Sequence, residues 1–307
     1  YPFINFKSER EIGNDLLTVQ NLKVVIDGET ILDNINFILR PGDKTALIGQ
    51  NDIQTTALIR ALMGDIEYEG TVKWGVTTSQ SYLPKDNTHD FDTNKSILDW
   101  LRQFASKEED DNTFLRGLLG RRLCWGDDVN KPSNVLSGGE KVHVRLSKVM
   151  LLKSNVLILD YPTNHLDLDA ILWLEEWLKA YDGTLLMISH DQAFLDNVVS
   201  NILHIENQQM TLYTGNYSTF VRTRSERLAQ QQQQFEKQQE TRAHLEDFIR
   251  RFKAKASKAK QAQARVKQLE RMTELAPIMA DNPFQFRFKS PVQLTSPLLV
   301  LDNASVG

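Results

Sequence analysis

The chain has 307 residues, 41% hydrophobic and 25% charged, which suits a globular protein of about two domains. Its one cysteine, Cys124, excludes an internal disulfide, and no apolar run approaches the roughly 18 residues that a membrane span needs. The net charge of −4 hides an asymmetry, because residues 1–215 carry 20 Lys and Arg against 31 Asp and Glu, whereas residues 216–307 carry 16 against 9. The basic tail predicts a polyanionic partner.

The start of the chain, Tyr1-Pro2-Phe3, has neither a methionine nor the pattern of a signal peptide. We therefore expect a soluble, cytoplasmic protein without a membrane partner, cut from a longer chain. A single cysteine fits the reducing cytoplasm.

Short apolar runs alternate with Gly and Asp turns in the first part of the chain. They predict strands at 16–19, 31–39 and 44–48, followed by a helix at 55–63. Residues 95–155 are mostly helical in pattern, and strands and helices then alternate to about residue 212. This order predicts an α/β core with an inserted helical region.

The amino-acid composition changes near residue 219. Residues 221–250 contain no Gly or Pro and predict a long helix, and residues 258–276 predict a second. The five glutamines 230–234 are the part of this predicted helix with an alternative, since such a run can also be disordered. Apolar residues of the two helices would meet across an antiparallel hairpin: Leu228, Phe235, Leu245, Ile249 and Phe252 with Val266, Leu269, Met272 and Leu275.

Short segments recur at an offset of 281 to 282 residues. Pro2-Phe3 recurs as Pro283-Phe284, and the run at 16–19 recurs at 298–301. The alternative is a chance likeness of two short apolar segments. The repeat predicts a chain that starts and stops at the same phase of a longer repeat, with domains at 1–217 and 218–282 and the first strand of a further domain at 283–307.

An ordered set of motifs indicates nucleotide chemistry. Leu136-Ser137-Gly138-Gly139-Glu140 opens a helix, and its short side chains let backbone N–H groups approach a phosphate. The apolar run 156–159 predicts a buried parallel strand that delivers Asp160 to the carboxyl edge of the sheet, where Mg²⁺ would bind. A bare Ser-Gly-Gly could be an ordinary turn, so the prediction depends on the set, which continues with Asn164-His165-Leu166-Asp167 and Ser189-His190-Asp191.

This set resembles the ATP-binding cassette (ABC) domain, and Pro162-Thr163-Asn164-His165-Leu166-Asp167 is similar to the soluble ABC-F subfamily. The resemblance implies an α/β ABC-type P-loop NTPase fold with an inserted helical subdomain, followed here by a long antiparallel helical hairpin. It implies ATP and Mg²⁺ as ligands and hydrolysis to ADP and phosphate. It also implies head-to-tail pairing with a second ABC domain, in the same longer chain or in a homodimer.

The phosphate loop departs from the family pattern. A loop of the form G-x-x-x-x-G-K-[ST] is expected after the strand at 44–48, and there Asp52 and Gln54 replace small residues and Thr55 replaces the lysine. Tyr161 stands where the family has the glutamate that activates water, and a phenol of pKa near ~10 is neutral at pH 7. We therefore expect this domain's own site to be weak or inactive, with the Ser-Gly-Gly half-site intact.

The resemblance assigns the site residue by residue. Catalytic positions are Asp160, His190 and Tyr161, and the Mg²⁺ ligands are Thr56 and Asp160. The nucleotide-binding positions are Gly49, Asn51, Thr55, Thr56, Lys85, Ser137, Gly138, Gly139 and Asp167.

Residues 250–272 hold nine Lys and Arg against one acid, Glu270. A solvated charged helix is the plain alternative, but the cluster lies at the expected hairpin tip and resembles the ABC-F interdomain linker, which implies the ribosome, with its rRNA and tRNA, as partner. The predicted RNA-binding residues are Arg250, Arg251, Lys253, Lys255, Lys258, Lys260 and Arg265. Two other functions stay open: a catalytically silent domain that donates its signature or docks a partner, and the ATPase subunit of a membrane transporter.

Overall fold

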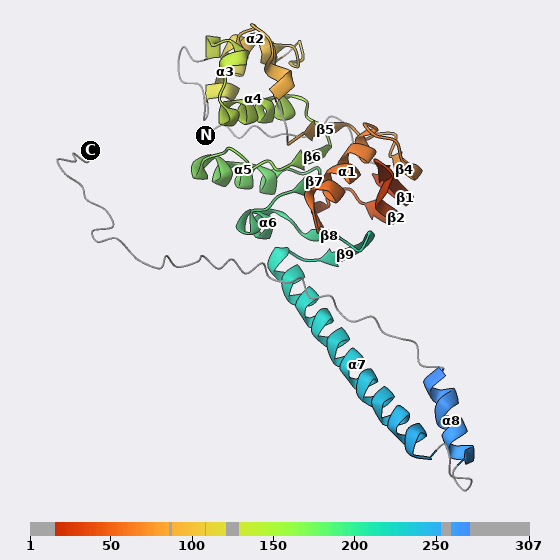
Figure 1. Cartoon of the computed structure of the whole chain (residues 1–307). Helices are drawn as coiled ribbons and strands as arrows, with labels where there is room; N and C mark the ends of the chain where they lie inside the picture. Colours follow the sequence, from red (N-terminus) through yellow and green to blue (C-terminus); the bar gives the residue numbers. More distant parts are fainter. Residues whose placement is uncertain (1–15, 86–87, 108, 121–128, 253–258, 271–307) are drawn as a thin grey trace, which may run out of the picture. The chain divides into compact units, whose positions relative to one another are not determined.

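The computed structural model describes residues 16–85, 88–107, 109–120, 129–252 and 259–270 (Figure 1). The chain divides into two units, Tyr1–Ser225 and Glu226–Gly307. The strand predicted within 283–307 lies outside the described residues. Among the helices that are described, none is both long and apolar enough to cross a membrane.

A six-stranded sheet in the order β5-β6-β7-β3-β8-β9 forms the centre of the first unit. Neighbouring strands are parallel except β8 and β9. The bounds are β3 Lys44–Gly49, β5 Gln80–Leu83, β6 Val156–Asp160, β7 Thr184–Ile188, β8 Asn201–Glu206 and β9 Gln209–Thr214. The predicted α/β core is confirmed, because continuous apolar runs form strands that are covered on both faces.

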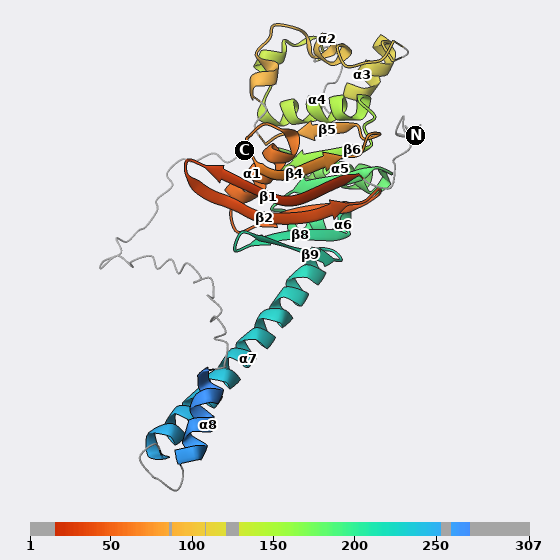
Figure 2. The same cartoon turned by 90° about the vertical axis from the view of Figure 1, so that its right-hand side faces the viewer.

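Layers on both faces bury the central strands completely (Figure 1 and Figure 2). The helices are α1 Asp52–Met63, α4 Gly138–Leu151, α5 Leu168–Ala180 and α6 Gln192–Val198. Alternate residues of β6 enter different cores: Val156 and Ile158 join the core around α1, and Leu157 and Leu159 join the core formed with α4, α5 and α6. The alternation follows from the two-residue period of a strand.

Polar bonds fix the starts of the central strands. Asn155, fully buried just before β6, accepts the Ser79 N–H with its Oδ1 at 2.8 Å and donates its own backbone N–H to Ser79 Oγ at 3.0 Å. At the start of β7, Thr184 Oγ1 accepts the Gly42 N–H at 2.9 Å. These bonds satisfy polar groups that would otherwise be buried without partners.

A second, antiparallel sheet has the order β2-β1-β4, with bounds Leu17–Ile26 for β1, Glu29–Leu39 for β2 and Glu69–Trp74 for β4. Helix α1 packs against this sheet and against β3. Strand β1 is longer than the expected 16–19, because polar residues near Asn21 form a bulge rather than a turn. Asn21 itself has φ of 49°, and the turn at Asp27 and Gly28, with φ of 52° and 83°, ends the strand.

The inserted helical region packs on the outer side of α4 (Figure 1). It contains η1 Thr88–Phe91, α2 Ile97–Arg102, α3 Asn112–Gly120 and η3 Ser133–Val135. Trp100 is buried at its centre, and Lys148 of α4 lies 4.2 Å from the ring centroid of Phe104. Buried Arg145 of α4 forms an ion pair with Asp90. The apolar side chains of α2 and α3 therefore share one core with α4.

Helix α7 (Tyr217–Phe252) begins in the first unit and includes the glutamine run 230–234 as helix. Its first turns pack against β8 and β9. Phe220 is buried with its ring centroid 5.0 Å from Tyr213 and 5.1 Å from His204, and Arg224 pairs with Glu206 at 2.6 Å. Aromatic packing of this kind stabilises beyond the area it buries.

In the second unit, α8 (Ala259–Glu270) lies beside the far part of α7 (Figure 2). Leu245 of α7 is buried, and Val266 and Leu269 of α8 are half-buried. The predicted partners Met272 and Leu275 lie outside the described residues.

Candidate functional site

Four parallel strands end at one edge of the six-stranded sheet. The residues that follow them include Asn51 and Asp52 after β3, Lys85 after β5, Tyr161 after β6 and His190 after β7. In open α/β sheets this carboxyl edge is where ligands bind. The topology therefore gathers sequence-distant polar side chains at one place.

Helix α1 begins earlier than the sequence indicates. Asn51 is its N-cap, and its side chain accepts the Gln54 N–H at 3.0 Å, so residues 52–55 form the first helical turn. Thr55, at the position of the missing lysine, is 3% exposed and donates its hydroxyl to the Asp52 carbonyl at 3.1 Å. A Cβ on Gly49 would lie 2.9 Å from the Thr55 methyl. The chain's own atoms therefore fill the space beside the loop.

Asp52 is the centre of a cluster of four polar side chains. Its carboxylate accepts Lys85 Nζ at 2.8 Å and the Tyr161 hydroxyl at 2.6 Å, and His190 Nε2 lies 3.5 Å away. Lys85 lowers the pKa of Asp52 most, and the Tyr161 hydrogen bond lowers it further. The carboxylate is thus ionised at neutral pH, accepts hydrogen bonds from the ends of two strands and contacts His190 at the end of a third.

Tyr161 is buried, and it adopts φ of 54°. Burial raises its pKa above the ordinary value, and the hydrogen bond to Asp52 raises it further. Its ring centroid lies 4.6 Å from that of His190, and Lys85 Nζ lies 4.4 Å above it. Tyr161 is a neutral donor here, so it does not supply the base that a carboxylate would supply at this position.

Asp160, the last residue of β6, is 2% exposed, and its Oδ1 has no hydrogen-bond partner among the described residues. Burial raises its pKa, which backbone and side-chain hydrogen bonds from Lys85 and Tyr82 oppose. A buried carboxylate oxygen without a donor fits a hard cation. Half-buried Thr56 in α1 is the second predicted ligand, so these residues fit Mg²⁺ shared with a phosphate.

The predicted Ser-Gly-Gly signature forms the N-terminus of α4. The Glu140 N–H donates to Ser137 Oγ at 3.3 Å and the Ser137 N–H donates to Glu140 Oε2 at 2.7 Å, a reciprocal capping box. Ser137 and Gly138 are exposed. A Cβ on Gly139 would lie 2.7 Å from the His165 carbonyl oxygen, which explains why glycine is needed there. This end of α4 leaves backbone N–H groups on the surface.

Asp167, a predicted nucleotide residue, is the N-cap of α5 and accepts the Ala170 N–H at 2.8 Å. Its oxygen is therefore used in capping the helix. Within the parts of the chain that are described, no three His, Cys, Asp or Glu side chains form a group that could hold a metal on their own.

The basic residues of the second unit differ in their surroundings. Arg250 pairs with Asp247 at 2.7 Å, and Arg251 pairs with the same carboxylate. Arg265 donates to Gln268 at 2.8 Å, and Lys260 is exposed. Lys253, Lys255 and Lys258 lie outside the described residues. Asp247 lies three residues before the basic segment 250–272, so the charge of that segment alone does not reveal this pairing.

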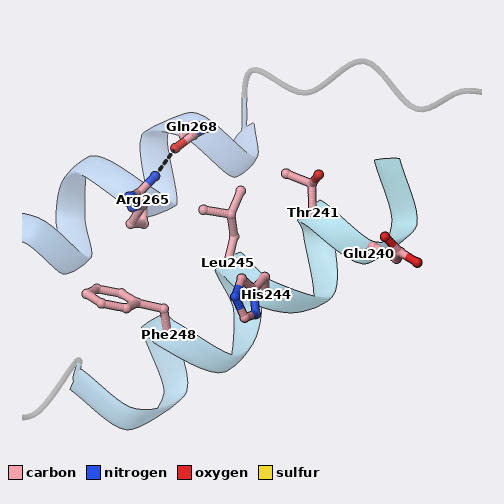
Figure 3. A pocket seen from close by; sticks show the side chains of 7 residues that line it. All are labelled: Glu240, Thr241, His244, Leu245, Phe248, Arg265 and Gln268. Carbon is pink, nitrogen blue, oxygen red and sulfur yellow. Dashed lines mark hydrogen bonds between the residues drawn. The ribbon is translucent and has the colours of Figure 1, made fainter. Parts of the chain in front are cut away.

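A groove of about 520 Å³ lies between α7 and α8 (Figure 3). Its lining mixes aromatic, apolar and charged side chains: Glu240, Thr241, His244, Leu245, Phe248, Arg265 and Gln268. Arg265 and Phe248 face each other from the two helices (Figure 3).

Two family profiles, both described as "ABC transporter", match residues 32–164 and 203–288. The "Probable ATP-binding protein YheS" of Escherichia coli K12 is 38% identical over 95% of this chain and 50% of its own length. YkpA of Bacillus subtilis, an uncharacterized ABC transporter ATP-binding protein, is 48% identical over 67% of this chain and 38% of its own length. The "ABC transporter F family member 3" of Arabidopsis thaliana is 37% identical over 58% of this chain and 25% of its own length.

The chain thus spans about half the length, or less, of these curated relatives. Among solved structures, an ABC transporter of metal-chelate type in an inward-facing conformation aligns with a TM-score of 0.52 at 19% identity, over 66% of this chain and 84% of the other. That likeness concerns the fold alone.

Proposed function

This chain belongs to the ABC-F subfamily of ATP-binding cassette proteins, and we propose that it acts on the ribosome in the cytoplasm under the control of ATP. The observation that carries this proposal is the basic segment of the second unit, with nine Lys and Arg against one acid in residues 250–272. Clustered cations bind the phosphates of structured RNA and release its counterions.

ABC domains work in pairs and use ATP, typically with Mg²⁺. We propose that the two ends of this domain contribute unequally to such a pair. The capped N-terminus of α4 would face the nucleotide of a second ABC domain, where exposed N–H groups stabilise phosphate oxygens. The N-terminus of α1 would bind its own nucleotide weakly, because Thr55 cannot replace a lysine–phosphate contact.

Mg²⁺, when bound, would neutralise charge on the phosphates, and Asp160 and Thr56 would hold it. Lys85 at the end of β5 and His190 at the end of β7 both lie against Asp52, so they would reach a phosphate oxygen only if it displaced that carboxylate. Tyr161 would hold a proton rather than take one. This arrangement supports nucleotide binding better than hydrolysis.

Ribosome co-sedimentation across a salt series tests the proposal. The variant changes Arg251, Lys253, Lys255 and Lys258 to Gln. Its matched control changes Arg222, Arg227, Lys237 and Arg242 to Gln, which removes the same charge from the part of α7 before the cluster. If about four cations contact phosphate, log affinity should fall against log salt with a slope of roughly −3 to −4.

We expect the variant of the four basic residues 251, 253, 255 and 258 to show a smaller dependence of affinity on salt and to leave the pellet at lower salt. The control should behave as the wild type. Arg251 is already paired with Asp247, so the lysines should account for most of the change. Equal pelleting of all three proteins at every salt concentration would mean that the basic residues 250–272 are only a solvated surface, and it would overturn the ribosomal proposal.

A second candidate is a catalytically silent domain that only donates its signature or docks a partner. The Asp52 cluster favours it, because the groups that would face a phosphate already hold a carboxylate. Steady-state ATP turnover of the chain above about 1 s⁻¹ that Asp160→Asn abolishes would exclude this candidate.

A further inference from the structure

We propose that Asp52 determines the nucleotide specificity of this site: its carboxylate takes the place of a terminal phosphate, so the site accepts a nucleoside diphosphate and rejects the triphosphate. This inference rests on the proposed nucleotide-binding function and names the ligand class of the same site.

The convergence of donors is the first observation. Lys85 and Tyr161 lie 33 and 109 residues from Asp52 in sequence, yet both donate to its carboxylate, at 2.8 and 2.6 Å. His190 reaches the same carboxylate from a third strand end, at 3.5 Å. A cation, a phenol and an imidazole around one anion form the kind of cradle that holds a phosphoryl group in NTPases. Here the anion belongs to the chain itself.

The helix end is the second observation. Asp52 is the first residue of α1, where a carboxylate interacts favourably with the helix dipole, as a bound phosphate would. A terminal phosphate placed among the same donors would meet the Asp52 charge at contact distance. Lys85, the cation that would bind this phosphate, is already paired with Asp52 at 2.8 Å, so the phosphate could bind there only by displacing the carboxylate.

Two buried oxygens without hydrogen-bond partners are the third observation. Within the described residues, Asp160 Oδ1 and Gln54 Oε1 are buried and have no hydrogen-bond partner. Both are acceptors, so they attract a cation or a donor rather than a bare anion, and at Asp160 that cation would be Mg²⁺. Backbone N–H groups at the start of α1 and the cation position at Asp160 remain for the two phosphates of a diphosphate and its Mg²⁺.

The experiment is calorimetric titration of the full chain with ADP and with ATP, each with Mg²⁺, and it needs no turnover. The variants are Asp52→Ala, which empties the position, and Asp52→Asn, which keeps its shape but removes the charge. Glu67→Gln is the matched control, because it removes one negative charge from an exposed residue outside the cluster.

We expect the wild type to bind ADP at least tenfold more tightly than ATP. Asp52→Ala should raise the affinity for ATP at least tenfold and change that for ADP less than threefold. Asp52→Asn should fall between, and Glu67→Gln should match the wild type. Tryptophan fluorescence reports whether each variant is folded, since all five tryptophans lie in the first 225 residues.

A wild type that binds ATP as tightly as ADP would overturn the inference, and so would an unchanged ADP-to-ATP ratio in both Asp52 variants. Failure of every protein to bind either nucleotide would overturn it as well. None of these outcomes alters co-sedimentation with ribosomes, so failure of this inference and failure of the ribosomal proposal are separate results.

Discussion

Helices α1 and α4 start in similar ways but present different surfaces to an anion. Each has a polar N-cap that accepts an N–H three residues on, Asn51 in α1 and Ser137 in α4. In α4 the next two residues are glycines and the backbone is exposed. In α1 the next residue is Asp52, whose carboxylate is bound by Lys85 and Tyr161. Glu140, the acid in the first turn of α4, instead accepts the Ser137 N–H at 2.7 Å and leaves Ser137 and Gly138 exposed. The position and partners of the chain's own carboxylate therefore decide whether a helix N-terminus is open to a ligand.

The largest effect is expected at the glycines of α4. A Cβ on Gly139 would lie 2.7 Å from a backbone oxygen, whereas a Cβ on Gly138 would come no closer than 3.5 Å, to the His165 ring. We expect Gly139→Ala to lower the free energy of unfolding by about 1–3 kcal/mol. Gly138→Ala should raise it by up to about 1 kcal/mol, because alanine loses less backbone entropy in a helix.

Denaturant unfolding followed by tryptophan fluorescence measures both variants. Equal effects of the two substitutions would contradict the close approach of α4 to His165. Gly117→Ala in α3 is the control, because a Cβ there would meet nothing within 4 Å.

A smaller effect is expected at the caps. Ser137→Ala and Asn51→Ala should each cost about 1 kcal/mol of unfolding free energy, since each leaves an N–H without its acceptor. Only Ser137→Ala should also weaken ATP-driven pairing with an ABC domain that has a complete phosphate loop. Light scattering of the mixed domains, with and without ATP, measures the pairing. An equal loss of pairing in both variants would remove the proposed difference between the two helix ends.

The smallest effect is expected in acid. The pKa of Asp52 is lowered in the folded chain, so this carboxylate stabilises the fold above its unfolded pKa of about 3.9. That stabilisation is lost as the pH falls from about 3.9 through the lower folded pKa. The side chain is 46% exposed and screened by solvent, so we expect a loss below about 1 kcal/mol.

Urea unfolding at several pH values between about 5 and 2.5 should show this loss in the wild type and in Glu67→Gln but not in Asp52→Asn. The same slope in all three proteins would mean that Lys85 and Tyr161 do not hold the carboxylate in solution.

Local patterns made much of this fold predictable. The strands β6 and β7 are continuous apolar runs, and α4 follows a capping sequence, so each could be recognised within a few residues. The start of α1 was predicted three residues too late, although Asn51 followed by Asp52 is an ordinary signal for the beginning of a helix. This signal is hidden because Asn51 and Asp52 fall inside the segment where the phosphate-loop pattern is expected.

The Asp52 cluster could not be predicted from such patterns. The sequence shows Asp52 where the family has a small residue, but the contact with Tyr161 spans 109 residues and depends on the order of strands in the sheet. Asp247 was missed for a simpler reason, because it precedes the stretch in which basic residues were counted. The residue assignments taken from the family pattern stay predictions until the nucleotide titrations are done.

The buried Asn155 has a consequence for folding fidelity. Residues 156–159 of β6 and 185–188 of β7 are apolar toward both cores, so a slip by one residue would exchange their side chains between two equally apolar layers. Such a slip would break the hydrogen bonds at the strand starts, which are the two between Asn155 and Ser79 and the one from the Gly42 N–H to Thr184 Oγ1. These few polar atoms therefore fix the register of the strands within an otherwise uniformly apolar interior.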